Sequence, residues 1–482
     1  MSIMSTPLRP RLGRRAVALL AAFVLPAFAC LPCFAQGEGR IASDFRREGE
    51  NLRACKTFTL TSLAGCAETL FTGQPVHIAV GSLAPQNGLG AGLAFSEHKH
   101  FADEWQLNED LDAVATSNAS WRAGVYLHAF RQPGGTIHVI IPKPGAPVPR
   151  RKPPTSLYRV APIFSLYAEA TSLNRIYYYG PGPNSSPLGR SVFGMTETIA
   201  GTSAIIPLAG KANIALLGEV NGRFPSVRGN HEESSPSIEL LYSEAGAPGL
   251  ASQPPYFQAG EGLRIKPSIK LLHLNYLVNF SQFVAPGNSQ YSFHRWTTDL
   301  DHQIPLYHSV RISSNDHYGP DTCSDSASEP CPHISMSRNL EGSIDARMII
   351  TESIADAGSA VPFYFQPTLG GSDINGTAML PSYPDYRFRA PNLLLLRGTF
   401  EHSIGKLPLG FLFSIDEGKV ASRRDDIDFT HMRHSFSTGL TVHAGGLPVI
   451  HLLFAWGGSE GHHVTANVDS VLLGASSRPS LF

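Results

Sequence analysis

The sequence has few charged residues, and beyond position 35 it has no long hydrophobic run. Lys, Arg, Asp and Glu make up 16% of its 482 residues, against about 25% in typical soluble domains. The net charge is only −1, so nucleic acid is not an expected partner. No window after position 35 approaches the roughly 18 consecutive apolar residues of a spanning helix.

Cysteine is also scarce, with six residues in the chain. Cys55 lies close to Cys66, and Cys323 lies close to Cys331, but neither pair has the C-x-x-C spacing of a metal site. We therefore predict no metal ion at either pair. In an oxidising compartment the two pairs would instead form local disulfides.

The N-terminal residues have the pattern of an export signal. A cluster of arginines precedes the apolar run 16–29, which is too short to span a bilayer and is followed by small residues. We predict that residues 1–35 are a signal peptide and that 36–80 form a short periplasmic segment. The remaining domain would then be 81–482.

Most of that domain alternates apolar and polar residues with the period of two that strands require. Within 105–115, Trp105 and Leu107 lie on one face and Asp110 and Asp112 on the other. The same alternation recurs at 121–129, 271–280 and 464–469.

Several of these runs reach about ten residues, longer than the five or six common in soluble proteins and close to a tilted membrane strand. Backbone groups in lipid must all be paired within the protein, so exported membrane strands must close on themselves. We therefore predict an all-β fold, a closed antiparallel transmembrane β-barrel of about 16 strands. The C-terminal strands are expected at 361–370, 388–403, 407–417, 434–444, 447–457 and 462–473.

The connections between these strands alternate in length. The turns at 405–406 and 445–446 are tight, whereas 421–433 is long and charged. Such barrels have short periplasmic turns and long outer loops. We therefore expect the long loop 312–337 to face outward, and we leave the side of the proline-rich connection 141–154 open.

One loop of this domain carries a distinctive motif, in the stretch PTLGGSDINGTAMLPSYPDYRF (367–388). Gly370 and Gly371 follow an expected strand, and Ile374, Asn375 and Gly376 follow a few residues later. The stretch resembles the bacterial surface antigen family, the BamA- and TamA-like outer-membrane barrels. In that family a strand ends at Leu-Gly-Gly, and a loop with a hydrophobic-Arg-Gly-aromatic motif folds back inside the barrel before five final strands. Five strand candidates follow here too.

Other segments extend the resemblance. Glu401 lies in LRGTFEHS, and Asp416 and Gly418 lie in FSIDEGKV, which resemble an acidic strand and an aliphatic-Asp-x-Gly strand of the family. The terminal Phe482 resembles the aromatic end that assembly machinery reads. Further likenesses lie at 81–95, 178–186 and 434–442.

Two departures from the family pattern stand out. Asn375 replaces the loop arginine, which the resemblance implies would pair with acid on the inner wall, here Asp416. Arg387 beside Phe388, or Arg389, is a candidate substitute, although both would also suit the membrane interface. In addition, residues 36–80 are too few for the periplasmic modules that receive client polypeptide in the family.

The resemblance implies a protein of the bacterial outer membrane that inserts or translocates polypeptide without a cofactor and without covalent chemistry. Its partners would be outer-membrane lipid, client polypeptide and assembly machinery. The alternatives are a passive porin or structural outer-membrane protein, and a secreted soluble β-sandwich that binds a ligand. Ser459 in GGSEG (457–461) matches G-x-S-x-G, but a strand follows it where that motif needs a helix. We therefore predict that the chain is not an enzyme.

Overall fold

The computed structural model describes the chain from residue 75 to residue 468, with gaps. The described ranges are 75–102, 105–131, 162–208, 213–230, 235–269, 272–314, 334–404, 409–444 and 447–468, with a few isolated positions between 42 and 70. The chain divides into two compact units, Met1–Arg47 and Glu48–Phe482, and the fold below is that of the second. The predicted signal peptide, the four cysteines of the two predicted disulfides (Cys55, Cys66, Cys323, Cys331) and Phe482 lie outside the described residues.

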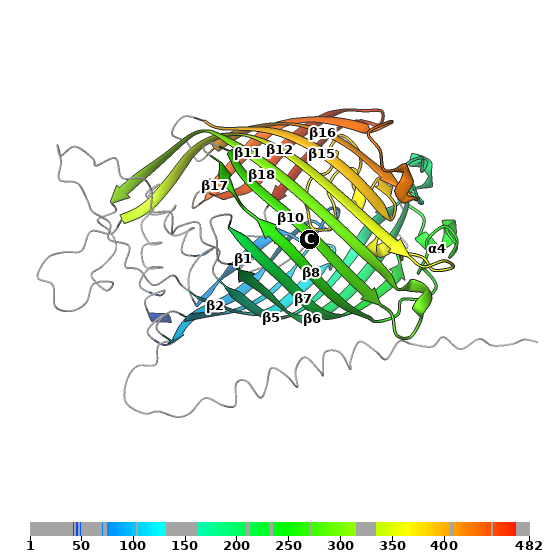
Figure 1. Cartoon of the computed structure of the whole chain (residues 1–482), viewed down its shortest axis with the longest axis horizontal. Helices are drawn as coiled ribbons and strands as arrows, with labels where there is room; N and C mark the ends of the chain where they lie inside the picture. The colour runs from blue at the N-terminus through cyan, green and yellow to red at the C-terminus, as the bar shows by residue number, and fades with distance from the viewer. Residues whose placement is uncertain are drawn as a thin grey trace, which may run out of the picture. The chain divides into compact units, whose positions relative to one another are not determined.

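Within the described residues, sixteen strands form one barrel wall (Figure 1). They are β1 (Val76–Ser82), β2 (Leu89–Ala102), β3 (Trp105–Ala115), β4 (Trp121–Arg131), β5 (Ile163–Tyr178), β6 (Ser191–Pro207), β7 (Ile214–Gly229), β8 (Tyr256–Ile265), β10 (Leu272–Val284), β11 (Phe293–Ser314), β12 (Ile334–Ala355), β15 (Asn392–Ser403), β16 (Leu409–Ala421), β17 (Arg433–Ala444), β18 (Leu447–Gly458) and β19 (Gly461–Val468). The two-residue β9 (Ser268–Ile269) adds to the edge of β10. This wall confirms the predicted all-β barrel of about 16 strands.

Each strand pairs antiparallel with the next one along the chain, from β1 with β2 to β18 with β19. The wall is nearly closed. The described parts of β19 and β1 meet at their ends, where the Val468 amide donates to Ser82 Oγ at 3.3 Å. No helix among the described residues has the length and hydrophobicity needed to cross a membrane.

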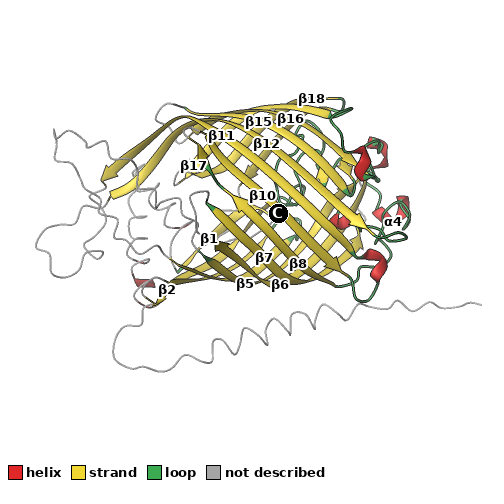
Figure 2. Ribbon diagram, viewed as in Figure 1, coloured by secondary structure: helices red, strands yellow, loops and turns green. Residues whose placement is uncertain are grey.

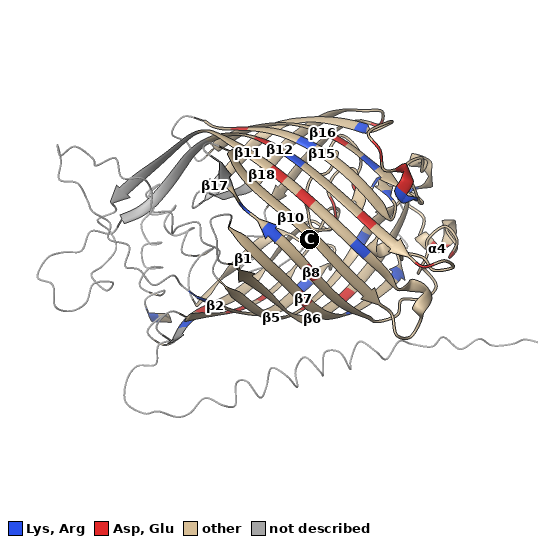
Figure 3. Ribbon diagram, viewed as in Figure 1, with Lys and Arg blue, Asp and Glu red and all other residues tan. Residues whose placement is uncertain are grey.

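The two faces of the wall are reversed relative to a soluble protein. Many of the side chains that point into the barrel are polar and enclosed, such as Asp110, Asp112 and Asn279. Side chains that point outward are apolar and exposed, with Leu93 at 62% and Phe224 at 56%. Figure 3 shows that the strands carry charged positions of both signs. Because successive strand residues face opposite sides, the period-two pattern in the sequence produces this arrangement directly.

One predicted strand is wrong. The stretch 361–370 does not join the wall; it holds a 3-10 turn (Phe363–Phe365) and β13 (Thr368–Leu369), which pairs with β14 (Phe388–Arg389) in a separate two-stranded sheet. Its aromatic residues pack in a buried cluster at one end of the barrel. This packing, and not the alternation of a strand, explains why the stretch is apolar. The barrel also begins at Val76, a few residues before the predicted boundary at 81.

The two ends of the barrel differ. At one end, which we call the cap end, buried residues from several connections form a cluster that includes Tyr178, Ile238, Phe363 and Tyr386. The short helix α4 (Ile238–Leu241) lies here, to the right in Figure 2. The connections at the cap end are 83–88, 116–120, 179–190, 230–255, 285–292, 356–391, 422–432 and 459–460.

At the opposite end, which we call the turn end, lie the strand ends that flank the short connections 405–408 and 445–446. The strand ends that flank 315–333 lie at this end too, because β12 enters the wall beside the end of β15, with Gly342 facing His402. The strand ends on either side of 315–333 therefore lie at the same end as those that flank the tight connections, which differs from the expected alternation of short and long connections between the two ends. Residues 315–333 themselves lie outside the described residues, so the outward orientation expected for 312–337 stays a prediction.

Candidate functional site: a loop folded into the barrel

The segment 370–388 leaves β13, folds into the barrel and returns through β14 (Figures 1 and 2). Both glycines at its start have positive φ, +106° at Gly370 and +59° at Gly371. A Cβ on Gly370 would lie 2.5 Å from Arg387 Cβ, and one on Gly371 would lie 2.1 Å from Asp385 Oδ1. Only glycine combines this backbone conformation with so close an approach. The Leu-Gly-Gly step is therefore a steric requirement of the fold-back.

The tip of the loop is a tight turn over residues 373–377. Asp373 Oδ1 accepts hydrogen bonds from the amides of Asn375 (3.0 Å) and Thr377 (2.8 Å), and Gly376 supplies the positive φ of +81°. The enclosure of Asp373 by the barrel raises the pKa of its carboxyl to about 6, because burial disfavours the charged form. Ile374 packs against the cap-end cluster, while the Asn375 side chain is exposed.

The first anchor of the loop is an ion pair on the wall. Asp416 on β16 is fully buried and accepts two hydrogen bonds from Arg397 on β15, both at 2.8 Å. The same guanidinium donates to the carbonyl of Ala378 in the loop, and the Leu380 amide donates to Asp416 at 3.2 Å. Such a two-pronged pair is strong and directional. Asp416, the acidic residue expected on the wall, thus contacts the loop. The arginine that pairs with it, however, comes from the wall and not from the loop.

The second anchor is Arg387, which is only 2% exposed. Its Nε donates to both carboxylate oxygens of Glu460, at 2.8 and 2.7 Å, and its terminal nitrogens donate to the hydroxyl and carbonyl of Ser185, at 2.8 and 2.7 Å. The guanidinium also stacks over Tyr179 and Phe388, with 5.0 and 4.6 Å to the ring centroids. Arg387 therefore joins the loop to the 178–186 segment and to the β18–β19 turn.

Arg389 serves the main chain instead. Its Nη1 donates to the Phe363 carbonyl at 2.7 Å, and its own carbonyl accepts from the Gly182 amide at 2.7 Å. Arg433 on β17 reaches the same segment, since it donates to the Pro183 carbonyl at 3.1 Å. The segment 178–186, which the sequence analysis singled out separately, is thus part of the loop's support.

Apolar contacts complete the support of the loop. Leu369, Leu380, Tyr383 and Phe388 pack against the wall in one buried cluster. The wall residues of that cluster are Ile349, Leu393, Leu395 and Val420. Gly418 faces this cluster, and a Cβ there would lie 3.0 Å from Leu369 Cδ1. The loop is therefore bound through its core as well as through its ionic groups.

The loop tip reaches the last strand of the barrel. Asn467 on β19 donates from Nδ2 to the Gly376 carbonyl at 3.2 Å, and its neighbour Val468 makes the hydrogen bond to Ser82 that joins β19 to β1. The Ser382 amide likewise donates to Ser435 Oγ on β17 at 2.9 Å. The tip thus lies beside the edge where the first and last strands meet.

Two other singled-out residues lie outside these anchors. Glu401 is on β15 and accepts a hydrogen bond from Thr441 Oγ1 at 3.3 Å. Ser459 lies in the turn between β18 and β19, a strand–turn–strand setting, as the sequence predicted. The described residues contain no group of three or more His, Cys, Asp or Glu that could hold a metal ion.

Sequence reasoning missed Arg397, Ser185 and Glu460. Arg397 faces Asp416 directly across the β15–β16 pair. Opposite charges at facing positions could have revealed this pair, but only if the register of the hairpin were known. Ser185 and Glu460 lie 202 and 73 positions from Arg387. No local pattern links them to it.

No protein-family model and no curated protein matches the chain. Among solved structures, the fold is similar to CdiB from Acinetobacter baumannii, at 10% identity and a TM-score of 0.43, over 82% of this chain and 59% of that one. BamA from Haemophilus ducreyi lacking POTRA domains 1–3 is similar at 11% identity and a TM-score of 0.45, over 82% and 69%. CdiB from Escherichia coli is similar at 12% identity and a TM-score of 0.45, over 82% and 62%.

This chain therefore covers less than two thirds of either CdiB chain. At these identities, what this chain does has to be inferred from its own residues.

Proposed function

We propose that this chain is a barrel of the bacterial outer membrane that inserts or translocates polypeptide at the edge between β1 and β19. The observation that carries the proposal is the infolded loop, which is fixed by Arg387 and by the Arg397–Asp416 pair while its tip contacts β19 through Asn467.

Membrane insertion is supported by the outer face of the wall. Exposed large apolar residues recur around it, from Leu93 on β2 to Phe454 on β18 and Val464 on β19. At about 25 cal/mol per Å² of apolar surface, leaving such a face in water is costly. A lipid bilayer removes that cost, and the signal peptide predicted at 1–35 would supply the route to it.

The edge between β1 and β19 supplies the working surface of the proposal. A strand edge carries unpaired amide and carbonyl groups that can template another strand. The loop would hold β19 in place through Asn467 while that edge opens. Client polypeptide would then pair with an edge strand and leave into lipid. No step makes or breaks a covalent bond.

A locked edge tests the proposal. The purified chain is reconstituted in vesicles, and the folding of an added unfolded outer-membrane barrel is followed by its heat-modifiable mobility. A disulfide between Ser82→Cys and Val468→Cys should abolish any acceleration of folding, and reductant should restore it. The single Ser82→Cys variant, given the same oxidation and reduction, is the control. Equal acceleration by the locked barrel, or none by the wild type, would refute the proposal.

A passive porin is the second candidate, because ionic side chains line the barrel interior. Arg347 pairs with Asp299 there through two hydrogen bonds of 2.8 and 2.7 Å, and charge on a pore wall tunes selectivity. Liposome swelling in small sugars distinguishes the two. Rapid permeation by a barrel that leaves client folding unchanged would favour the porin.

A further inference from the structure

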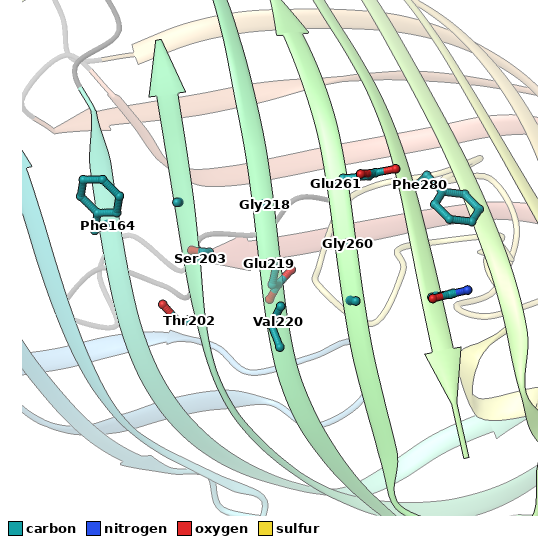
Figure 4. Close-up of a pocket in the computed structure, with 12 residues that line it drawn as sticks. Phe164, Thr202, Ser203, Gly218, Glu219, Val220, Gly260, Glu261 and Phe280 are labelled. Carbon is teal, nitrogen blue, oxygen red and sulfur yellow. The ribbon is translucent and has the colours of Figure 1, made fainter. Parts of the chain in front are cut away.

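The outer wall is hollowed across β5, β6, β7, β8 and β10 (Figure 4), leaving a groove of about 450 Å³. Its lining includes small residues, among them Gly218 and Ala259, and larger apolar ones, among them Phe164, Val220 and Phe280. A Cβ on Gly218 would meet nothing within 4 Å, so the glycine is not required by packing within this chain. Small residues of this kind allow another backbone to approach closely in a membrane.

Glu261 on β8 lies in this groove and faces outward. Its neighbour Gly262 faces the lumen, because a Cβ there would lie 3.0 Å from Oδ1 of the buried Asn279. Successive strand residues face opposite sides, so Glu261 points away from the lumen. It stands opposite Gly218 on β7 and opposite Phe280 on β10, beside which it is drawn in Figure 4. Among the described residues, Glu261 has no ion-pair partner.

The carboxylate lies near mid-height of the wall. β8 runs from Tyr256 to Ile265, so about five residues separate Glu261 from either end. At about 3.4 Å per residue and a tilt of about 40°, this is roughly 13 Å of depth, half of an apolar band about 25 Å tall. An ionisable group at such a depth is costly unless a partner of opposite charge is supplied.

We propose that this groove binds a membrane-embedded polypeptide segment that carries one Lys or Arg midway along a slim apolar surface. The proposal rests on the membrane location proposed above but not on polypeptide transport. Lipid is a poorer match, because its headgroups remain at the interface and its acyl chains carry no charge.

A second copy of this barrel is also a poorer match. Lys99, Arg228 and Lys419 lie near the ends of their strands and already have partners within the chain. These three side chains of the described strands therefore could not supply an unpaired positive charge at the depth of Glu261.

The test uses the full chain inserted in phosphatidylcholine vesicles, with insertion verified by heat-modifiable mobility and protease protection. Two synthetic 20-residue Leu/Ala helices are compared as probes, one with a central Lys and one with a central Leu, each carrying an acceptor dye for tryptophan fluorescence. We expect the barrel to bind the Lys helix at least tenfold more tightly than the Leu helix. Glu261→Leu should remove that preference, whereas Glu261→Asp should retain it.

Gly218→Trp, which fills the groove, should abolish binding of both helices. Equal binding of the two helices by the wild type, or a preference that survives Glu261→Leu, would overturn the inference. Retention of lipid that Gly218→Trp displaces, with no helix preference, would assign the groove to an acyl chain and would overturn it equally. A chain that does not insert in the vesicles would instead refute the membrane location, and the groove proposal with it.

Discussion

Replacing Arg387 by methionine would remove the buried guanidinium that joins the loop to Glu460 and Ser185. The apolar stem of the side chain is kept, so the change is chiefly one of charge and hydrogen bonding. Removing one partner of a buried ion pair costs about 3–5 kcal/mol, because the other charge is left uncompensated. Since each 1.4 kcal/mol is about tenfold in an equilibrium, the open form of the loop should become at least about 100-fold more populated.

Hydrogen exchange of the peptide 370–388 measures that opening, because its amides donate within the loop, as from Gly370 to Met379 at 2.8 Å. The control is Arg423→Met, whose guanidinium is 77% exposed and 3.7 Å from Asp425. An exposed pair contributes about 0–1 kcal/mol, so the exchange of 370–388 should not change in the control.

A double variant makes the test stricter. Glu460→Gln removes the charge that Arg387→Met leaves unpaired, so the double variant should open less than the sum of the two single effects. If Arg387→Met exchanges no faster than Arg423→Met, or if the two single effects add, then Arg387 is not the anchor described here.

Three further outcomes are expected. Gly371→Ala should lower the free energy of unfolding by about 1–3 kcal/mol, because residue 371 has a positive φ and a Cβ there would be crowded. The control is Gly398→Ala, where a Cβ would meet open space, and it should change the free energy of unfolding by under about 0.5 kcal/mol. Denaturant titration of the two variants in vesicles measures both effects. Asn375→Arg should leave loop exchange unchanged because the wall acid is already paired, but should partly rescue Arg397→Gln. The pKa of Asp373, raised to about 6, means that the folded loop binds a proton more tightly than the released loop. Loop protection should therefore fall as pH rises from 5 to 7, and Asp373→Asn should remove that dependence.

The wall was predictable from the sequence because its cause is local. Alternation along 105–115 predicts β3 at its observed bounds, and the five strands after the loop follow from the same period. The Leu-Gly-Gly step was also visible, since the backbone conformation it needs is specific to glycine. By contrast, 361–370 was mistaken for a strand because an apolar run that packs in a cluster has no period to contradict the assignment.

The anchors were beyond sequence reasoning for a different reason. The pairing of Arg397 with Asp416 depends on the register of one hairpin, and Arg387 depends on segments that meet only once the barrel is closed. Asp416 could be expected from the resemblance, but which arginine would reach it could not. Glu261 was overlooked because an isolated acidic residue in an alternating strand attracts notice only when its face is known.

The apolar outer face of the wall also affects how the chain would fold before it meets a bilayer. The apolar side chains on the outer face would stay in water if the barrel closed before it met lipid, so they would contribute no hydrophobic stabilisation to folding there. In the absence of lipid, hairpins such as β15–β16 would associate with one another through the unpaired backbone groups of their edge strands. If the barrel acts in a membrane as proposed, the chain would have to reach that membrane unfolded, with its apolar side chains covered by another protein.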